Sequence, residues 1–231
     1  MQGLSVLVYQ NTYHPVFRDQ KMGGIEIILH GNRIATGGEV RLEPTPEQWD
    51  PVPTFTARRH GPRPDELIAL SGYPDVGVHY RLDVTAEGEG FRVAVDLDHP
   101  LPESLLGKAG FNLELLPTAY FGKNYMLDDG FGIFPRHPDG PMRLTAGDVA
   151  EPLPLASGHR IVVAPEDPTT RVTIASDTGE IQLFDGRNKA QNGWFVVREL
   201  IAANRTTNAV VWHVHPHVIP GWVRPPASRS R

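Results

Sequence analysis

The chain has 231 residues, of which 40% are hydrophobic and 21% charged, with a formal net charge of −5 and no cysteine. This composition is typical of a soluble globular protein, and the length fits one large all-β domain. The absence of cysteine excludes disulfides, zinc-thiolate sites and a cysteine nucleophile, and the negative charge disfavours nucleic acid and membrane as partners.

The N-terminal third contains short apolar runs that are rich in β-forming residues. The strands predicted here are Leu4–Tyr9, Ile25–His30, Arg33–Thr36 and Val40–Leu42. The next stretch, Pro44–Pro64, is rich in proline and arginine, so we expect an insertion or a long loop over the sheet. The N-terminus lacks the basic start and long apolar run of a signal peptide, and no run approaches the roughly 18 apolar residues of a membrane helix.

The clearest hairpin in the sequence follows. Segments Val78–Thr85 and Phe91–Leu97 both alternate strictly between hydrophobic and polar residues, and Glu87–Gly90 lies between them as a glycine-containing turn. Strict alternation is typical of strands with one buried face, because successive side chains of a strand point to opposite sides. The sequence therefore predicts two paired strands with their hydrophobic residues turned inward.

The remaining strands continue at a spacing of about ten residues, with turn signals between them. They are Phe111–Leu116, His159–Ala164, Arg171–Ala175, Ile181–Asp185, Trp194–Leu200 and Val210–Val214. Helical signals are limited to short turns, such as Pro102–Leu106. The fold class predicted is all-β, a large antiparallel β-sandwich of the supersandwich kind with few or no helices. We expect one domain over residues 1–222 and a linker or tail over 223–231, with two domains meeting near Leu144–Leu155 as the alternative.

The segment Phe111–Pro141 combines aromatic rings with polar side chains, and glycines and prolines interrupt it every few residues. Flat apolar rings beside planar hydrogen-bonding groups are typical of surfaces that bind sugars. The candidate sugar-binding residues in this segment are Tyr120, Lys123, Tyr125, Asp128 and Arg136. The same composition also fits a long irregular loop with inward rings, and the sequence leaves both interpretations open.

A second polar run lies in Phe184–Arg198, where Asp185 begins a turn and Trp194 opens the next strand. Arginine and asparagine suit bidentate hydrogen bonds to vicinal hydroxyls, and tryptophan suits stacking on a sugar ring. The candidates here are Arg187, Asn188, Asn192 and Trp194, with Trp49 as a further platform. The alternative is a polar hairpin loop with a core tryptophan.

Three histidines lie close together in the run Trp212–His217. Residues i and i+2 of a strand share a face, so His213 and His215 could both reach a metal ion. His217 would be a third ligand if Pro216 leaves the strand direction intact. The alternative is a histidine-bearing strand face without a metal, in which case no cofactor is expected.

The candidate carboxylates for acid–base chemistry are Glu114, Asp128, Asp129, Asp139 and Asp185. Glycoside hydrolysis needs two carboxylates about 5–9 Å apart, which sequence spacing across strands cannot show. The neighbours Asp128 and Asp129 would face opposite ways on an extended chain. A lyase would need a base such as Tyr120, Lys123, Tyr125 or His137 beside an arginine such as Arg136. No P-loop, GxGxxG, HExxH or GxSxG motif is present, so no catalytic residue is assigned.

Three stretches together resemble a known kind of region: Tyr13–Asp50, Phe111–Pro141, and Asp185–Arg198 with Ile219–Arg224. They are similar to an N-terminal region ahead of the immunoglobulin-like and catalytic domains in some bacterial cellulase-like proteins of glycoside hydrolase family 9. The resemblance spans nearly the whole chain, but the histidine cluster departs from it. In that family the catalytic carboxylates belong to a helical barrel further along the protein, so the resemblance assigns none of them to this chain.

We therefore expect a non-catalytic, carbohydrate-associated β-sandwich module. It would bind a polysaccharide or pack on the glycoside hydrolase catalytic domain of the same larger protein, and it would be secreted or periplasmic if that protein is exported. One alternative is a polysaccharide-active lyase or hydrolase that depends on a metal held by His213, His215 and His217. A purely structural spacer between domains is the third hypothesis.

Overall fold

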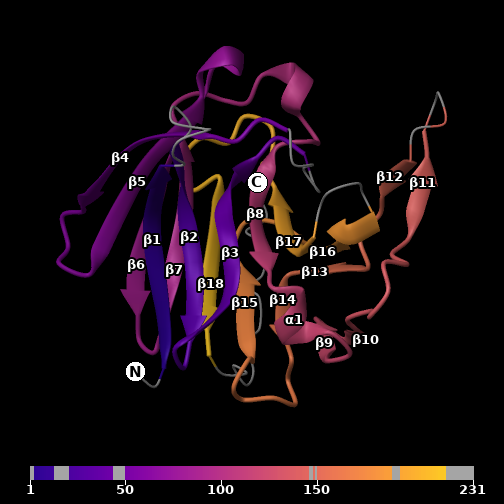
Figure 1. Ribbon diagram of the computed structural model, residues 1–231. Coiled ribbons are helices and arrows are strands. Elements are labelled where there is room, and N and C mark those ends of the chain that lie inside the picture. The colour runs from indigo at the N-terminus through magenta and orange to yellow at the C-terminus, as the bar shows by residue number, and fades with distance from the viewer. Residues whose placement is uncertain are drawn as a thin grey trace, which may run out of the picture.

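The computed structural model of the chain describes residues 3–12, 21–43, 50–145, 148, 150–188 and 193–216. These residues form two large antiparallel sheets and a small separate hairpin (Figure 1). The prediction of an all-β sandwich is confirmed. Within the described ranges, no helix has the length and apolar character needed to cross a membrane.

One layer is a seven-stranded sheet whose neighbouring strands are all antiparallel. In spatial order its strands are β1 (Leu4–Thr12), β2 (Lys21–Leu29), β3 (Asn32–Arg41), β8 (Gly110–Leu115), β17 (Phe195–Leu200), β16 (Ile181–Asp185) and β13 (Ala156–Gly158). The central strand β8 joins the strands from the N-terminal part of the chain to those from its C-terminal part. This sheet therefore brings together residues that are far apart in the sequence.

The other layer is a nine-stranded antiparallel sheet. In spatial order its strands are β10 (Gly130–Ile133), β9 (Asn124–Leu127), β14 (Arg160–Val163), β15 (Val172–Ser176), β18 (Val210–His215), β7 (Gly90–Leu97), β6 (Val78–Glu87), β5 (Glu66–Tyr73) and β4 (Thr54–His60). The last described strand, β18, lies in the middle of this sheet, between β15 and β7.

The rest of the regular structure is small. Strands β11 (Met142–Leu144) and β12 (Ala150–Pro152) form a two-stranded sheet that projects from one side of the molecule (Figure 1). Helix α1 covers Pro117–Tyr120, and short 3₁₀ turns cover Pro74–Val76, Glu103–Leu105 and Gly186–Asn188. The expectation of few helices is confirmed for the described residues.

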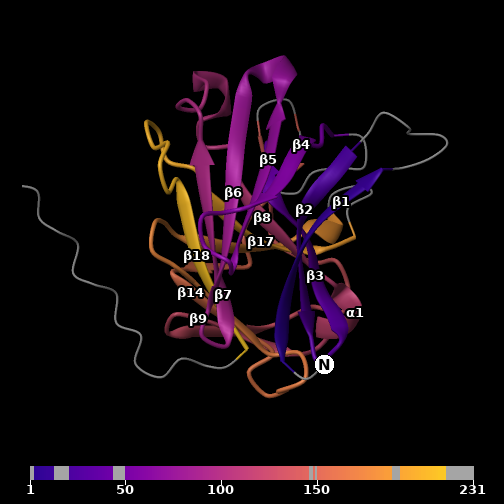
Figure 2. The same cartoon turned by 90° about the vertical axis from the view of Figure 1, so that its left-hand side faces the viewer.

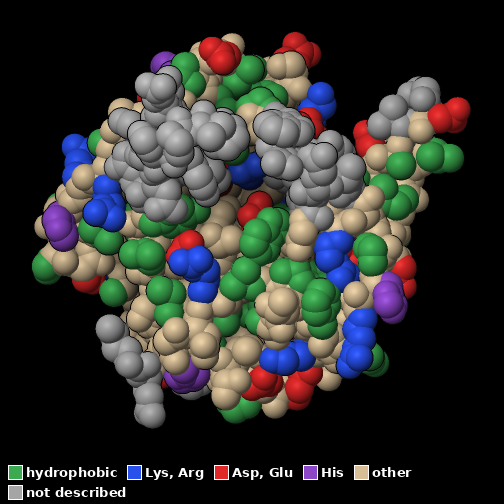
Figure 3. All heavy atoms as spheres, viewed as in Figure 1, with side chains coloured by type: hydrophobic (Ala, Val, Ile, Leu, Met, Phe, Trp, Pro, Cys, Tyr) green, Lys and Arg blue, Asp and Glu red, His purple; other side chains and the backbone are tan. Residues whose placement is uncertain are grey.

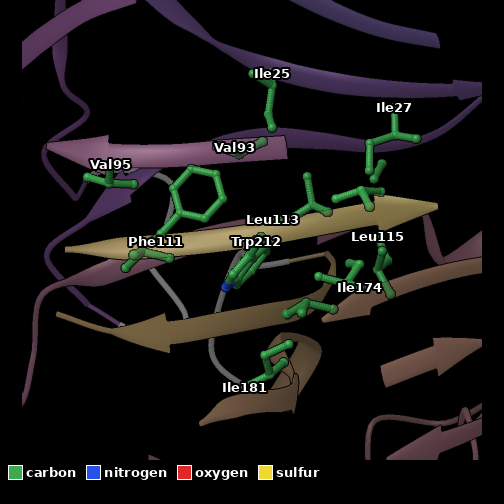
Figure 4. Packing of buried hydrophobic residues seen from close by; sticks show 14 of the residues in the cluster. Ile25, Ile27, Val93, Val95, Phe111, Leu113, Leu115, Ile174, Ile181 and Trp212 are labelled. Atoms are coloured by element: carbon green, nitrogen blue, oxygen red, sulfur yellow. The ribbon is translucent and has the colours of Figure 1, made fainter. Parts of the chain in front are cut away.

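The core lies between the two sheets, which Figure 2 shows as separate layers, with β18 and β7 on one side and β3 on the other. On β8 the inward residues Phe111, Leu113 and Leu115 are all buried. Trp212 of β18 points toward them from the other sheet, and its ring centre lies 4.9 Å from that of Phe111 in an edge-on arrangement (Figure 4). Period-two alternation thus assigns one face of each central strand to the core.

The predicted hairpin around residues 87–90 is confirmed. Strands β6 and β7 pair in register from Tyr80 opposite Leu97 to Glu87 opposite Gly90. The hydrophobic residues that alternate along both strands are buried, as the pattern predicts. The register of such a hairpin is fixed by its turn and by the burial of one face.

The expectation of a loop over Pro44–Pro64 is wrong for its second half. Residues Thr54–His60 form β4, and β5 follows at Glu66–Tyr73, a strand that the sequence did not predict. β4 is an edge strand, so five of its seven positions are exposed or half-buried polar residues and its pattern lacks hydrophobic alternation. Edge strands commonly carry charged residues and lie near prolines, which hides them from periodicity.

Candidate functional site

Charged and polar side chains occupy the centre of the seven-stranded sheet on the face that points away from the core. On β8, Asn112 and Glu114 alternate with the inward residues. The registers place Glu39 of β3 and Arg198 of β17 on either side of Asn112. Arg41 follows two residues after Glu39 and therefore shares its face. We call Glu39, Arg41, Asn112, Glu114 and Arg198 the outer-face cluster.

Most of the outer-face cluster is buried, although it lies outside the core. Glu39 is 2% exposed, Arg41 is 7% exposed, and Asn112 and Arg198 are 0% exposed. Figure 3 looks onto this face and shows acidic and basic side chains among hydrophobic ones near its middle. Charged groups are rarely buried to this degree without a structural or functional reason. This face is therefore the candidate functional site.

Two carboxyl groups of the cluster have altered acidity. Arg41 Nη1 donates a hydrogen bond to Glu39 Oε1 across 2.6 Å, which makes a buried ion pair. Burial raises the pKa of Glu39 to about 7, even though Arg41 acts in the opposite direction. Burial also raises the pKa of Glu114 to about 7, again against the attraction of Arg41. Both groups therefore change protonation near neutral pH.

Arg198 differs from Arg41 because it has no bonded counter-ion. Within the described part of the chain, none of its three guanidinium nitrogens has a hydrogen-bond partner. Its guanidinium lies against Gly110, where a Cβ atom would be 2.9 Å from Nε. Burial lowers the pKa of Arg198 to about 9, and Glu43 offsets only part of that shift. An unpaired buried guanidinium is energetically costly, which singles this residue out.

The polar surface extends from the outer-face cluster toward β1 and β2. The Thr36 hydroxyl donates a hydrogen bond to Glu26 Oε1 at 3.1 Å, and Arg33 Nε lies 3.0 Å from Glu26 Oε2. Burial and the nearby Glu39 carboxyl raise the pKa of Tyr9 to about 12, so its hydroxyl keeps its proton and can donate hydrogen bonds. The face thus presents carboxyl, amide, hydroxyl and guanidinium groups on one rigid sheet.

We expect the free energy of unfolding to fall as the pH rises from about 4.5 to about 7, and Glu114→Gln to reduce that fall. The folded pKa of Glu114 is raised, so the folded chain keeps a proton that the unfolded chain releases. This contribution is fully present below pH 4.5 and is lost as the pH rises through about 7. A rise from 4.5 to about 7 corresponds to at most about 3 kcal/mol for this carboxyl.

Urea unfolding at pH values from about 4 to about 8, followed by tryptophan fluorescence, measures this effect. The matched control is Glu103→Gln, since Glu103 is exposed on a surface turn. The prediction is checked by comparing the pH dependence of the free energy of unfolding between the wild type and each variant. Parallel curves for the wild type and Glu114→Gln would show that Glu114 titrates like an ordinary surface carboxyl.

The structure places two of the sequence-predicted sugar-binding rings inside the molecule. Tyr120 is 0% exposed and Tyr125 is 7% exposed, and both rings pack against Phe134. The Tyr120 hydroxyl donates a hydrogen bond to the carbonyl of Thr170 at 3.1 Å. The prediction that these two tyrosines form a stacking platform is therefore wrong, because their faces are already covered by the core.

Other predicted residues of the same segment hold the loops together. Lys123 Nζ donates hydrogen bonds to Asp167 Oδ2 at 2.6 Å and to Thr170 Oγ1 at 2.8 Å. Asp128 accepts hydrogen bonds from the backbone amides of His159 and Arg160. These contacts give Lys123 and Asp128 structural roles, whereas Arg136 is exposed.

The two segments that the sequence singled out do meet in the structure, through Arg187. Its guanidinium donates hydrogen bonds to Asp185 and to the carbonyls of residues 135–137, and it lies over the rings of Phe121 and Phe195. Asn188 Nδ2 donates a hydrogen bond to the Gly140 carbonyl at 2.7 Å. Both side chains are occupied by the protein itself rather than held ready for hydroxyls. Trp194 is half-buried, and Asn192 and Trp49 lie outside the described residues.

The predicted histidine cluster is only partly described. His213 and His215 lie on the same face of β18, and His217 lies outside the described residues. The two ring nitrogens of His213 face carboxylates, with Glu87 at 2.6 Å and Asp177 at 2.9 Å. Burial disfavours the imidazolium, but these two hydrogen bonds outweigh it and raise the pKa of His213.

The carboxylates beside His213 bear on whether the histidines could hold a metal ion. Among the described residues, no group of three or more histidine, aspartate or glutamate side chains is arranged to hold a metal ion. The fold supplies the acidic neighbours that the local sequence lacks, and they form ion pairs with His213. We therefore do not propose a metal site from the part of the cluster that the structure describes.

Comparison of the chain with protein-family models, with curated proteins and with solved structures found no match. Of the outer-face cluster, sequence reasoning named only Glu114, as a candidate carboxylate. The available signal was a charged residue between hydrophobic residues in a predicted strand, as in Glu114 between Leu113 and Leu115 and in Arg198 after Val197. Such a pattern indicates that the outer face of a strand is polar. It does not show which strands are neighbours in the sheet.

Proposed function

We propose that this chain is a non-catalytic carbohydrate-binding β-sandwich module whose binding face is the outer face of the seven-stranded sheet. The observation that carries this proposal is the outer-face cluster, with carboxyl, amide and guanidinium groups together on adjacent strands. Planar donors and acceptors of this kind form paired hydrogen bonds with vicinal hydroxyls. The proposed binding face does not include Tyr120 and Tyr125, because both rings are buried in the core.

The rigidity of the sheet supports the same proposal. Thr36 and Glu114 are the half-buried polar residues opposite each other on the paired strands β3 and β8, so a ligand that contacts them would not have to order long, mobile side chains. Such preorganisation lowers the entropic cost of binding. Sugars are nevertheless well hydrated, and we expect micromolar or weaker affinity for a single module.

The partners proposed are a polysaccharide and a glycoside hydrolase catalytic domain of the same larger protein. The second partner rests on the resemblance to the N-terminal regions of family 9 cellulase-like proteins. A secreted or periplasmic location would follow from membership of an exported glycosidase. Packing on a catalytic domain and binding of sugar are compatible, since they can use different faces of the sandwich.

Affinity gel electrophoresis on a panel of glucans, mannans, xylans, pectins and xanthan tests the proposal. We expect retardation of the wild type by at least one polymer, and a weakening of about five-fold or more in Glu114→Gln, because the amide replaces an acceptor by a donor. Glu103→Gln, on an exposed turn, should migrate like the wild type. Absence of retardation on every polymer would overturn the binding proposal.

A second candidate function uses the same face for catalysis. Burial raises the pKa values of Glu39 and Glu114 to about 7, and among the described residues an arginine is bonded to Glu39 and none to Glu114. Two carboxyl groups in different environments can serve as acid and base in the cleavage of a polysaccharide. New reducing ends or unsaturated products on the same panel, formed by the wild type and not by Glu114→Gln, would show that the chain is an enzyme rather than a binding module.

A further inference from the structure

Strand β10 forms one edge of the nine-stranded sheet and presents large apolar side chains to solvent (Figure 1). Phe131 is 86% exposed and Ile133 is 61% exposed. Met126 lies opposite Phe131 on β9 and is 41% exposed. These three side chains share the face that points away from the core, since Tyr125 and Leu127 of β9 occupy the inward positions. Exposed apolar surface of this kind is typical of an interaction site.

The backbone of β10 is also open along its outer side. The Phe134 N–H donates a hydrogen bond to the Lys123 carbonyl at 2.9 Å, so residue 134 directs its backbone groups toward β9. In an antiparallel pair these groups alternate along the strand, so Gly132 also faces β9, whereas Phe131 and Ile133 face away from it. Among the described residues, no other strand or loop receives a backbone hydrogen bond from Phe131 or Ile133.

The opposite edge of the same sheet is built differently. Strand β4 carries Arg58, Arg59 and His60, and its pairing with β5 contains a register shift. Charged residues and irregular pairing discourage the addition of another strand to an edge. The sequence of β10 is Gly-Phe-Gly-Ile, without charge or proline, and it pairs with β9 without a shift. The sheet is therefore protected at β4 and left open at β10.

The open edge is complementary to itself. If two copies of β10 pair antiparallel about Gly132, Phe131 of each copy lies opposite Ile133 of the second copy. An aromatic residue opposite a β-branched residue is a favourable cross-strand pair. The exposed Asp129 precedes the strand and the exposed Arg136 follows it. Antiparallel pairing brings the acidic end of each strand beside the basic end of the other, so the charges are complementary as well.

We infer that β10 pairs antiparallel with β10 of a second copy of this chain, so that the nine-stranded sheet continues across a two-fold dimer. The Phe131 and Ile133 N–H and carbonyl groups would then all be bonded, as in other cases of strand addition to a sheet edge. A four-residue strand buries less than the roughly 1,200–2,000 Å² of a stable interface, so the dimer is weak.

The symmetry of this contact has a consequence for the sandwich. The two-fold axis that relates antiparallel edge strands is perpendicular to the sheet, so it keeps each side of the sheet on the same side in both copies. The seven-stranded sheets of the two copies therefore lie side by side and face the same way. The pairing involves only β10 and would occur whether or not the outer face binds a sugar.

Sedimentation velocity of the full chain from about 1 to about 300 µM measures the association, for which we expect a dissociation constant of about 10–100 µM. Ile133→Lys should weaken it about ten-fold or more, because the ammonium group would lie against the Phe131 ring of the second copy. The matched control is Val76→Lys, which introduces the same charge at an exposed apolar residue of a surface turn and should associate like the wild type.

A proline variant separates strand pairing from simple contact between apolar side chains. Ile133→Pro removes an N–H that points away from β9, so the ladder within one copy is kept. We expect Ile133→Pro to stay monomeric over the whole concentration range, with a melting temperature within a few degrees of the wild type. Ile133→Val keeps the N–H and most of the side chain and should still dimerise.

The absence of cysteine allows the register to be tested directly. A mixture of Phe131→Cys and Ile133→Cys chains should be crosslinked by a short bismaleimide in higher yield than either variant alone. The reason is that these two positions lie directly opposite each other across the proposed dimer, whereas identical positions lie diagonally. Equal yields in the mixture and in the single variants would contradict pairing about Gly132.

The remaining outcomes decide the inference as a whole. A wild type that stays monomeric at about 300 µM would overturn it. A dimer that persists unchanged in both Ile133→Lys and Ile133→Pro would also overturn it, since another surface would then join the copies. If the chain is monomeric and an added extended peptide shifts the nuclear magnetic resonance signals of β10, the edge serves a foreign strand and the second copy is the wrong partner.

Discussion

Replacement of Arg187 by alanine is expected to lower the free energy of unfolding by about 4 kcal/mol. The side chain of its ion-pair partner Asp185 is 0% exposed, so the variant would leave a buried carboxylate without a cation. It would also free the carbonyls of residues 135–137 and remove the guanidinium from the rings of Phe121 and Phe195. The penalty arises mainly from the charge and carbonyls left behind, rather than from the loss of one contact.

Guanidinium chloride unfolding of the wild type and of Arg187→Ala measures this change. Arg143→Ala provides the matched control, because the Arg143–Glu151 pair is exposed on both sides and should contribute less than about 1 kcal/mol. Asp185→Asn combined with Arg187→Ala should recover part of the lost stability, since the buried charge is then absent. A loss in Arg187→Ala as small as that of the control would mean that the loop contacts are not maintained in solution.

The second large effect is expected at Glu199, where alanine should cost about 3–5 kcal/mol. Glu199 lies on β17 but faces the core, and it is 1% exposed. Its carboxylate accepts hydrogen bonds from Trp212 Nε1 at 2.7 Å, from Ser176 Oγ at 2.5 Å and from Thr178 Oγ1 at 2.6 Å. Trp212 and Ser176 belong to the other sheet, so one carboxylate joins the two layers.

Two further variants show how much of the stability loss comes from individual hydrogen bonds of Glu199. Trp212→Phe removes a single donor and keeps most of the ring, so it should cost less than Glu199→Ala. Glu199→Gln keeps the shape but replaces one acceptor by a donor, and we expect an intermediate loss. The measurement is again chemical unfolding, with far-ultraviolet circular dichroism as the signal so that the tryptophan change does not affect it. A smaller loss in Glu199→Ala than in Trp212→Phe would contradict the central position of the carboxylate.

The sequence predicts strands well where one face of the strand is buried. Residues 78–97 alternate strictly, and the structure confirms the strands, the turn and the inward residues. Ile181–Asp185 is confirmed with the same bounds. β4 was not predicted, because this edge strand consists mostly of polar residues and lacks a clear alternation of hydrophobic and polar positions. Residues 117–133 were difficult for another reason, since one short helix and two four-residue strands are each below the length that a period needs.

The candidate site was less accessible to prediction than the fold. Composition identified the rings of Tyr120 and Tyr125 but cannot tell a stacking surface from a core, because both need flat apolar groups. Glu39, Glu114 and Arg198 lie on three strands whose adjacency follows from long-range pairing through β8. Their raised or lowered pKa values arise from burial, which only the assembled sheets provide.

The position of β18 has a consequence for how the chain acquires its structure during synthesis. Strands β7 and β15 belong to one sheet, yet both pair with β18, which the ribosome makes after every other described strand. Until then the hydrophobic faces of the early hairpins have no complete partner layer, and non-local pairing of this kind is slow. A nascent chain that stalls before Val210 would present unfinished sheets to the cell, because the nine-stranded sheet can be completed only after Val210–His215 has left the ribosome.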